Sequence, residues 1–203
     1  MALEGTPVWE PKARPLALGP AAAGRHAEHL TSVLLQHESP DGLGRLVEES
    51  YATPLLRRAR PSASQLSKGL ALRDADLLLA GAEPLLGLGP GLTPSGDDFL
   101  AGFLGLAVLA SPDTAPLLRK VGRGMLRLAE ARTTLLSRAF LAHALVGALA
   151  PPVDALAAAI LSGAPRQAVA QAARAASGLG HTSGMDMLAG IVLALRALGR
   201  RSP

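Results

Sequence analysis

The 203-residue chain has no cysteine, which excludes disulfides, thiolate catalysis and zinc sites built on thiolates. Aromatic residues make up only 2% of it, so it lacks the aromatic platforms that usually accompany a basic nucleic-acid-binding face. The net charge is only +4, and the arginines are spread along the chain rather than gathered in one stripe. We therefore expect no nucleic-acid partner.

Long hydrophobic runs are absent as well. The longest uncharged apolar stretch, residues 99–110, is shorter than the roughly 20 residues that a membrane-spanning helix needs. The proline-broken start, residues 1–20, has no apolar run of signal-peptide length after a basic patch. We therefore expect no membrane span, no export signal and a cytoplasmic location.

Helical periodicity dominates the rest of the chain, and no segment alternates polar and β-branched residues as a strand would. With short loops, this predicts a mainly α, compact multi-helix bundle of antiparallel neighbours. Residues 1–20 should form an irregular lead-in anchored by Trp9, followed by a single helical domain over residues 21–203. Helices are expected at 21–36, from 41 towards Tyr51 with an interruption near Pro54, and at 62–79, 97–110, 113 onwards, 133–149, 153–161, 165–176 and 184–198. Residues 74–80 are an alternative short strand.

Two segments of the chain repeat each other. Residues 95–102 (SGDDFLAG) and 183–190 (SGMDMLAG) share six identities at a constant offset, 183 − 95 = 88. Glycines precede both segments, at Gly87, Gly89, Gly91, Gly178 and Gly180. The repeat predicts an internal pseudo-two-fold pair of helices, each starting at a Gly/Ser/Asp segment.

Two interpretations of these segments are open. Serine followed three residues later by aspartate resembles a capping box, which stabilises a helix start by about 0.5–2 kcal/mol. The alternative is a ligand site, because glycine-rich loops expose backbone N–H groups to a ligand. Gly102 and Gly190 favour an additional close helix crossing, since glycine inside a helix costs about 0.5–1 kcal/mol relative to alanine.

If the two helix starts converge, their free amides and positive dipole ends would suit a phosphate or carboxylate. Carboxylates at Asp97, Asp98 and Asp186 would then fit a bridging Mg²⁺ ion, an amide or ammonium donor, or capping alone. No cofactor other than Mg²⁺ is implied. The candidate catalytic residues are His181 as general acid or base, Asp98 and Asp186. The candidate anion-binding residues are Gly89, Gly91, Thr93, Ser95, Gly96, Asp97, Arg132 (a bidentate clamp or equally a surface arginine), Thr133, Thr134, Thr182, Ser183 and Gly184.

The longest motif, residues 87–102 (GLGPGLTPSGDDFLAG), resembles the signature of the AllH-type family. Residues 180–190 (GHTSGMDMLAG) resemble the second signature of that family, and Arg132-Thr-Thr with Ser137 resembles a further feature. The resemblance covers about residues 80–200. Family members carry a longer, β-rich N-terminal part, most of which we expect this chain to lack.

The resemblance implies a subunit of oxamate carbamoyltransferase, in allantoin and purine catabolism. That enzyme interconverts oxalurate and phosphate with oxamate and carbamoyl phosphate, and it includes an FdrA-like subunit and a further partner. Three hypotheses follow for this chain: a transferase subunit that binds a small anionic substrate between the two motif helices, a non-catalytic ligand-binding or assembly subunit, and a helical domain whose motifs are only caps.

Overall fold

The structure, a computed structural model, describes residues 10–36 and 41–200, so the expectation for Trp9 lies outside the described residues. Over these ranges it contains nine α-helices and no strand, which confirms the mainly α prediction. None of the helices in these ranges is long and apolar enough to cross a membrane. The α-helices are α1 (Pro20–Leu34), α2 (Pro54–Leu72), α3 (Ala75–Ala82), α4 (Ser95–Ala110), α5 (Ala115–Ala129), α6 (Leu135–Ala144), α7 (Pro151–Leu161), α8 (Arg166–Ser177) and α9 (Ser183–Gly199), and two short 3₁₀ helices are η1 (Gly44–Val47) and η2 (Glu83–Leu85).

Local capping chemistry explains where the sequence prediction of α2 and α3 was wrong. Pro54 does not interrupt a helix but opens α2, because proline has no N–H to lose at the first helical position. Thr53 precedes it and accepts a hydrogen bond from the N–H of Leu56 at 3.2 Å. The alternative strand at 74–80 is wrong: Asp74 caps α3 by accepting from the amides at its start, and the residues after it are helical.

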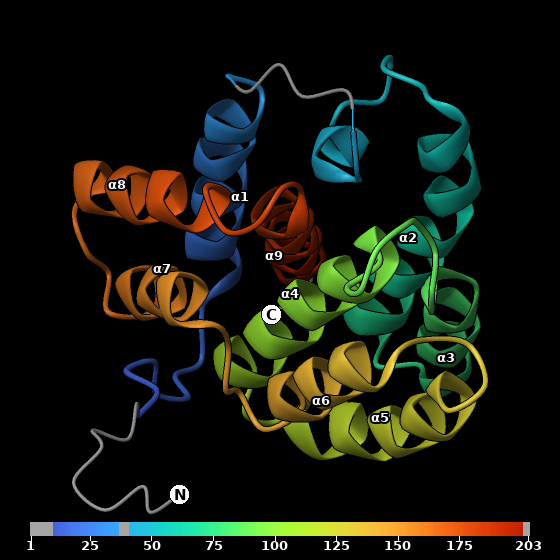
Figure 1. The fold of residues 1–203 in the computed structure, drawn as a ribbon. Helices are drawn as coiled ribbons and strands as arrows, with labels where there is room; N and C mark the ends of the chain where they lie inside the picture. Colours follow the sequence, from blue (N-terminus) through green and yellow to red (C-terminus); the bar gives the residue numbers. More distant parts are fainter. Residues whose placement is uncertain (1–9, 37–40, 201–203) are drawn as a thin grey trace, which may run out of the picture.

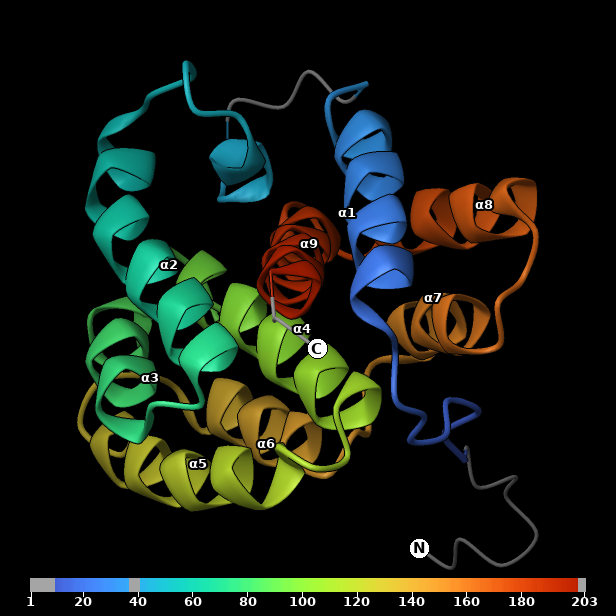
Figure 2. The same cartoon turned by 180° about the vertical axis from the view of Figure 1, so that it is seen from behind.

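Helix α9 runs through the middle of the molecule, beside α4 (Figures 1 and 2). Helices α1, α7 and α8 lie on one side of it, and α2, α3, α5 and α6 lie on the other. Every residue of α4 is buried, which is expected of a central helix that is apolar on all faces. The two motif helices therefore form the core around which the others pack.

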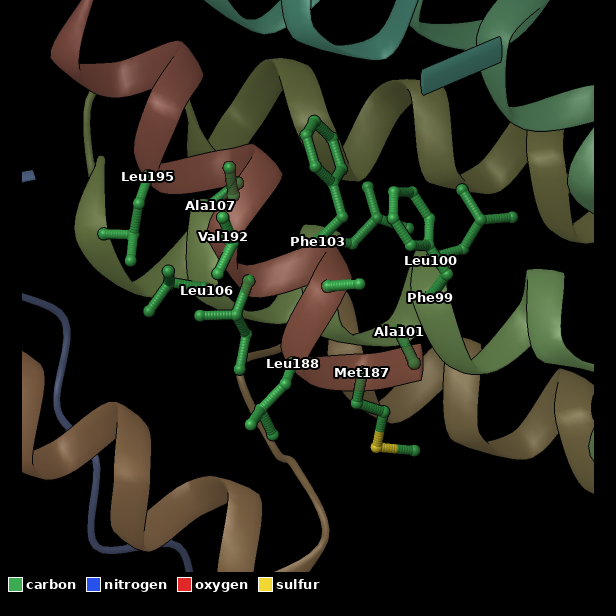
Figure 3. Packing of buried hydrophobic residues seen from close by; sticks show 14 of the residues in the cluster. Phe99, Leu100, Ala101, Phe103, Leu106, Ala107, Met187, Leu188, Val192 and Leu195 are labelled. Atoms are coloured by element: carbon green, nitrogen blue, oxygen red, sulfur yellow. The ribbon is translucent and has the colours of Figure 1, made fainter. Parts of the chain in front are cut away.

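The crossing of α4 and α9 preserves the symmetry of the repeat. A Cβ atom on Gly102 would lie 2.0 Å from the carbonyl oxygen of Met187, and one on Gly190 would lie 2.0 Å from that of Phe99. Both contacts relate equivalent positions, because 187 − 99 = 88 and 190 − 102 = 88. Side chains of the two helices interdigitate around this point (Figure 3). The repeat is thus a close backbone crossing in which each glycine accommodates the other helix.

The described part of the lead-in, residues 10–19, has no helix and is held by hydrogen bonds to distant elements. Leu16 N–H donates to Leu109 C=O and Leu18 N–H donates to Ala110 C=O, each at 2.9 Å. The buried carboxylate of Asp154, in α7, accepts from the backbone amides of Lys12 at 2.6 Å and Ala13 at 3.2 Å. Asp154 therefore ties the lead-in to the bundle.

Replacing Asp154 with alanine is expected to lower the free energy of unfolding by about 1–3 kcal/mol, because two amides lose their acceptor beside the buried Ala13. Chemical denaturation measures this loss, and limited trypsin digestion should cut faster after Lys12. The control is Asp76→Ala, an exposed carboxylate in α3, for which we expect a change below about 1 kcal/mol. Equal stability of Asp154→Ala and the wild type would contradict the anchoring role.

Candidate functional site

The structure brings the starts of α4 and α9 together. The hydroxyl of Thr93, just before α4, lies 3.2 Å from the hydroxyl of Ser183, the first residue of α9. This hydrogen bond joins the two repeat segments directly. The geometric expectation that two distant stretches of the chain share one place is therefore confirmed.

The capping interpretation of the repeat is wrong. Ser95 and Ser183 are already helical residues, preceded by Pro94 and Thr182, and neither helix start has a side-chain cap hydrogen bond. The residue before each helix, Pro94 or Thr182, uses only its backbone carbonyl, which accepts from an N–H three or four residues later. The carbonyl of Thr182, for example, accepts from the N–H of Asp186 at 2.9 Å. The shared spacing of serine and aspartate in the two repeats is therefore not explained by capping.

Serine and aspartate pair crosswise between the repeats. The hydroxyl of Ser183 lowers the pKa of Asp98, and the hydroxyl of Ser95 lowers the pKa of Asp186, so each serine acts on the aspartate of the other repeat. The backbone N–H of Leu43 also donates to Oδ1 of Asp186. The Oδ2 atoms of both aspartates are buried and have no hydrogen-bond partner among the described residues. Asp186 therefore has one satisfied and one unsatisfied carboxyl oxygen.

Burial makes the carboxyl groups of Asp98 and Asp186 weaker acids than an ordinary aspartate. It raises the pKa of Asp98 to about 6, against the opposing effect of the Ser183 and Thr93 hydroxyls. It raises the pKa of Asp186 to about 7, against the Leu43 amide and the hydroxyls that face it, and the negative charge of Asp98 adds to the rise. The charge of Asp98 thus influences Asp186, and both carboxyl groups change protonation state near neutral pH.

An open pocket of about 880 Å³ lies over these helix starts. Its lining includes the hydroxyl-bearing residues at the two helix starts, here called the hydroxyl floor: Thr93, Ser95, Thr182 and Ser183. Its other lining residues are Asp41, Gly42, Thr53, Pro54, Leu55, Pro90, Gly91, Leu92, Gly180 and His181. Since Asp98 and Asp186 are 2% and 0% exposed, they lie behind the floor hydroxyls rather than in the pocket. A ligand would meet the hydroxyls first, and the carboxyl groups through them.

His181 lies at the exposed rim of the pocket. Its Nε2 atom is 3.4 Å from Oδ2 of Asp41, and both side chains are largely exposed. These two are the ionisable side chains among the lining residues, which include no arginine or lysine. The predicted histidine is therefore placed at the site but on its solvent side.

Asp97, Thr133 and Thr134 hold the glycine loop over residues 87–96 rather than line the pocket. Asp97 accepts from the N–H of Gly87 at 3.1 Å and from the hydroxyl of Thr133. Burial raises the pKa of Asp97, and these hydrogen bonds oppose the rise. The hydroxyl of Thr134 donates to Leu92 C=O at 2.6 Å. This network fixes the loop that carries Thr93 into the site.

Arg132 lies outside the pocket. Its guanidinium forms an ion pair with Glu83 at 2.6 Å, and it lines a separate hollow together with Arg58. Its carbonyl oxygen occupies the space that a side chain on Gly87 would need. The structure thus places this arginine as a support of the loop, at a distance from the hydroxyl floor.

The glycines of the motifs have two distinct roles. Gly89 and Gly91 adopt positive φ angles of 116° and 94°, a region that favours glycine, and so shape the loop. Gly96 and Gly184 are close-packing positions, where a Cβ would lie 2.1 Å and 2.0 Å from backbone oxygens. Their amides donate to the carbonyls of earlier residues at 2.8 Å and 2.9 Å. Those two amides are therefore engaged within the protein, contrary to the simple anion-site expectation.

The three carboxylates do not form the magnesium site that was one sequence alternative. Over residues 10–36 and 41–200, no group of three or more His, Cys, Asp or Glu side chains could hold a metal ion. Asp97 faces Gly87 and Thr133, whereas Asp98 and Asp186 face the other repeat.

Sequence reasoning missed the segment around Asp41–Leu43, which closes one side of the site. Gly42 has a φ of 74°, and a Cβ there would lie 2.5 Å from Oδ1 of Asp186. This segment belongs to neither repeat, so the offset pattern did not mark it. The Asp-Gly dipeptide is a turn signal, but it does not indicate which distant carboxylate the turn contacts.

The part of the chain that carries both repeat segments matches a known protein family. The family model described as oxamate carbamoyltransferase subunit AllH matches residues 85–195. The matched range includes the glycine loop, α4 and most of α9, and hence both repeat segments. No curated protein and no solved structure matches the chain.

Proposed function

Because the chain belongs to the AllH family, which is described as an oxamate carbamoyltransferase subunit, we propose that it is a subunit of a carbamoyltransferase-type enzyme. In this proposal it binds a small anionic substrate in the pocket between the starts of α4 and α9. The observation that carries it is the hydroxyl floor of the pocket, with two buried carboxyl groups directly behind it. The proposed pathway is allantoin and purine catabolism, with an FdrA-like subunit and a further subunit as partners.

The proposed chemistry is carbamoyl transfer between oxamate and carbamoyl phosphate. The amide nitrogen of oxamate forms a bond to the carbamoyl carbon, the bond from that carbon to the phosphate oxygen breaks, and the nitrogen releases one proton. Hydroxyl donors such as Ser95 and Ser183 suit the negative charge that develops on the carbamoyl oxygen. Asp98 and Asp186, with pKa values of about 6 and 7, suit a proton that is released near neutral pH. His181 at the rim is a further candidate acid or base.

The charge of the pocket supports a shared active site. Phosphate groups are usually bound by arginine, lysine or a metal ion, and no arginine or lysine is among the lining residues of the described chain. We therefore propose that a partner subunit supplies the cationic groups for the phosphate. The same observation favours a second candidate function, in which this chain binds the ligand and the partner performs the chemistry.

Calorimetry of the purified chain tests this function. We expect wild type to bind oxamate, and Ser183→Ala to weaken binding by about tenfold or more, because a floor hydroxyl is lost. The matched control is Ser162→Ala, which removes an exposed hydroxyl after α7 and should leave binding unchanged. Carbamoyl transfer should require the partner subunits. Absence of oxamate binding by a folded chain, together with no activity after partners are added, would sink the proposal.

A further inference from the structure

The outward face of helix α6 is apolar along its whole length. Ser137, Leu141 and Ala144 are buried on the inner face, where α6 packs against α4 and α5 (Figure 1). The charged residue of this helix, Arg138, is half-buried and forms an ion pair with Glu130 at 3.6 Å. The exposed residues, here called the α6 face, include no arginine, lysine, aspartate or glutamate: Leu135, Leu136, Ala139, Phe140, Ala142, His143 and Val146.

The α6 face reaches the rim of the hydroxyl pocket through Leu92. This leucine is 74% exposed and lines the pocket. Its carbonyl oxygen accepts from the hydroxyls of Thr134 at 2.6 Å and Ser137 at 3.5 Å, which fixes it against the start of α6. Leu135, the next residue after Thr134, is 78% exposed. A protein seated on the α6 face would therefore extend over the pocket.

The gathering of exposed apolar side chains at this place is unusual for a protein surface. Single exposed leucines are normal, whereas contiguous apolar patches mark protein–protein interaction sites. Phe140 adds an exposed aromatic ring, the kind of side chain that anchors interfaces, whereas Phe99 and Phe103 are fully buried. Of the eight large apolar residues that are exposed in the described ranges, five belong to this surface: Leu92, Leu135, Leu136, Phe140 and Val146.

On the basis of the proposed function, we propose that the α6 face and Leu92 form the docking surface for a partner subunit that carries an arginine or lysine beside an apolar contact surface. Charge complementarity identifies this occupant. The lining of the pocket includes the carboxylate of Asp41 but no arginine or lysine, and the proposed phosphate substrate is anionic. A subunit docked on the α6 face brings its cationic side chain over the pocket, where the chain itself has none.

A second copy of this chain fits the surface less well. Two copies packed face to face would be related by a two-fold axis, so each would present its own α6 face to the other. That face has no arginine or lysine, and the nearby Arg138 is already paired with Glu130. Self-association would therefore bury the apolar side chains but leave the charge of the pocket unmatched.

Two equally exposed leucines, one on the α6 face and one far from it, test the docking. Leu135→Glu places a carboxylate in the apolar contact, so its affinity for the FdrA-like or the further partner subunit should fall about tenfold or more in calorimetry. The matched control is Leu72→Glu, which changes a residue that is 71% exposed, and its affinity should equal that of the wild type. Leu72 ends α2, about 27 Å along the helix from Pro54, which lines the pocket.

Cross-linking tests whether the docked subunit reaches the pocket. The chain has no cysteine, so Leu92→Cys supplies a single thiol for a benzophenone maleimide label. We expect this label to cross-link the partner subunit, at a segment that includes an arginine or lysine. The same label on Leu72→Cys should give no cross-link to the partner.

The outcomes separate this inference from the proposed function. Unchanged affinity of Leu135→Glu, an equal loss in Leu72→Glu, or no cross-link from position 92 would overturn the inference. A wild-type dimer that Leu135→Glu dissociates in sedimentation velocity would also overturn it, because a second copy would then occupy the face. Binding of neither partner subunit to wild type would overturn it as well. Oxamate calorimetry of the chain alone, which both glutamate variants should leave unchanged, tests the pocket separately.

Discussion

Replacing Gly190 with alanine is expected to lower the free energy of unfolding by about 3 kcal/mol or more. The new Cβ would lie 2.0 Å from the carbonyl oxygen of Phe99 and 2.8 Å from the amide nitrogen of Phe103, whereas ordinary contacts begin near 3.4 Å. Both atoms are backbone of α4, so relief requires α4 and α9 to move apart and to open the core between them. For a chain of this size the melting temperature should fall by about 6–12 °C in calorimetry or circular dichroism.

The symmetry of the crossing supplies a second variant and α1 supplies a control. Gly102→Ala should cost a similar amount, because its Cβ would meet the carbonyl of Met187 at the equivalent position. Gly24→Ala, inside α1, meets nothing within 4 Å and should instead stabilise the protein by about 0.5–1 kcal/mol. A Gly190→Ala protein as stable as the wild type would show that the two helices do not cross at these residues.

Replacing Asp186 with asparagine is expected to make the protein more stable than wild type at neutral and alkaline pH. Burial raises the pKa of Asp186 from 3.8 to about 7 in the folded protein. Its contribution to stability is therefore fully present below the unfolded value and is lost as pH rises through about 7. Asparagine keeps an acceptor for the Leu43 amide but never ionises. We expect a gain of about 2–4 kcal/mol at about pH 8.

Urea denaturation at several pH values measures this gain. The difference between Asp186→Asn and wild type should grow from about pH 4 to pH 7 and level off above that. Asp98→Asn should show a smaller gain that levels off at lower pH, because the pKa of Asp98 rises only to about 6. Asp76→Asn, an exposed carboxylate in α3, should show no such growth. If Asp186→Asn is less stable than wild type at alkaline pH, burial does not destabilise the ionised form of Asp186 in the folded protein.

Much of the fold could be predicted, because local sequence patterns indicate where most of the helices lie. The absence of alternating β-branched segments and the helical spacing of apolar residues predicted a mainly α bundle, and the prolines marked most helix starts. The errors arose where one residue type has two uses. Proline both ends helices and opens them, and Pro54 opens α2 rather than interrupting a helix. Aspartate occurs in strands, turns and caps, and Asp74 caps the helix at 75–82.

For the candidate site, the order of residues along the chain was enough to predict two equivalent segments, a close crossing at Gly102 and Gly190, and hydroxyl and carboxyl groups at each helix start. Which of these groups lie close to one another depends on how the helices pack. Serine and aspartate at this spacing suit a local capping box and a crossed pair between helices equally well, because both uses place them on the same helix face. In the packing of α4 against α9, each serine acts on the aspartate of the other helix. Asp97 instead contacts the glycine loop. The segment Asp41–Leu43 borders the site through the Leu43 amide, and no pattern along the chain marks this contact.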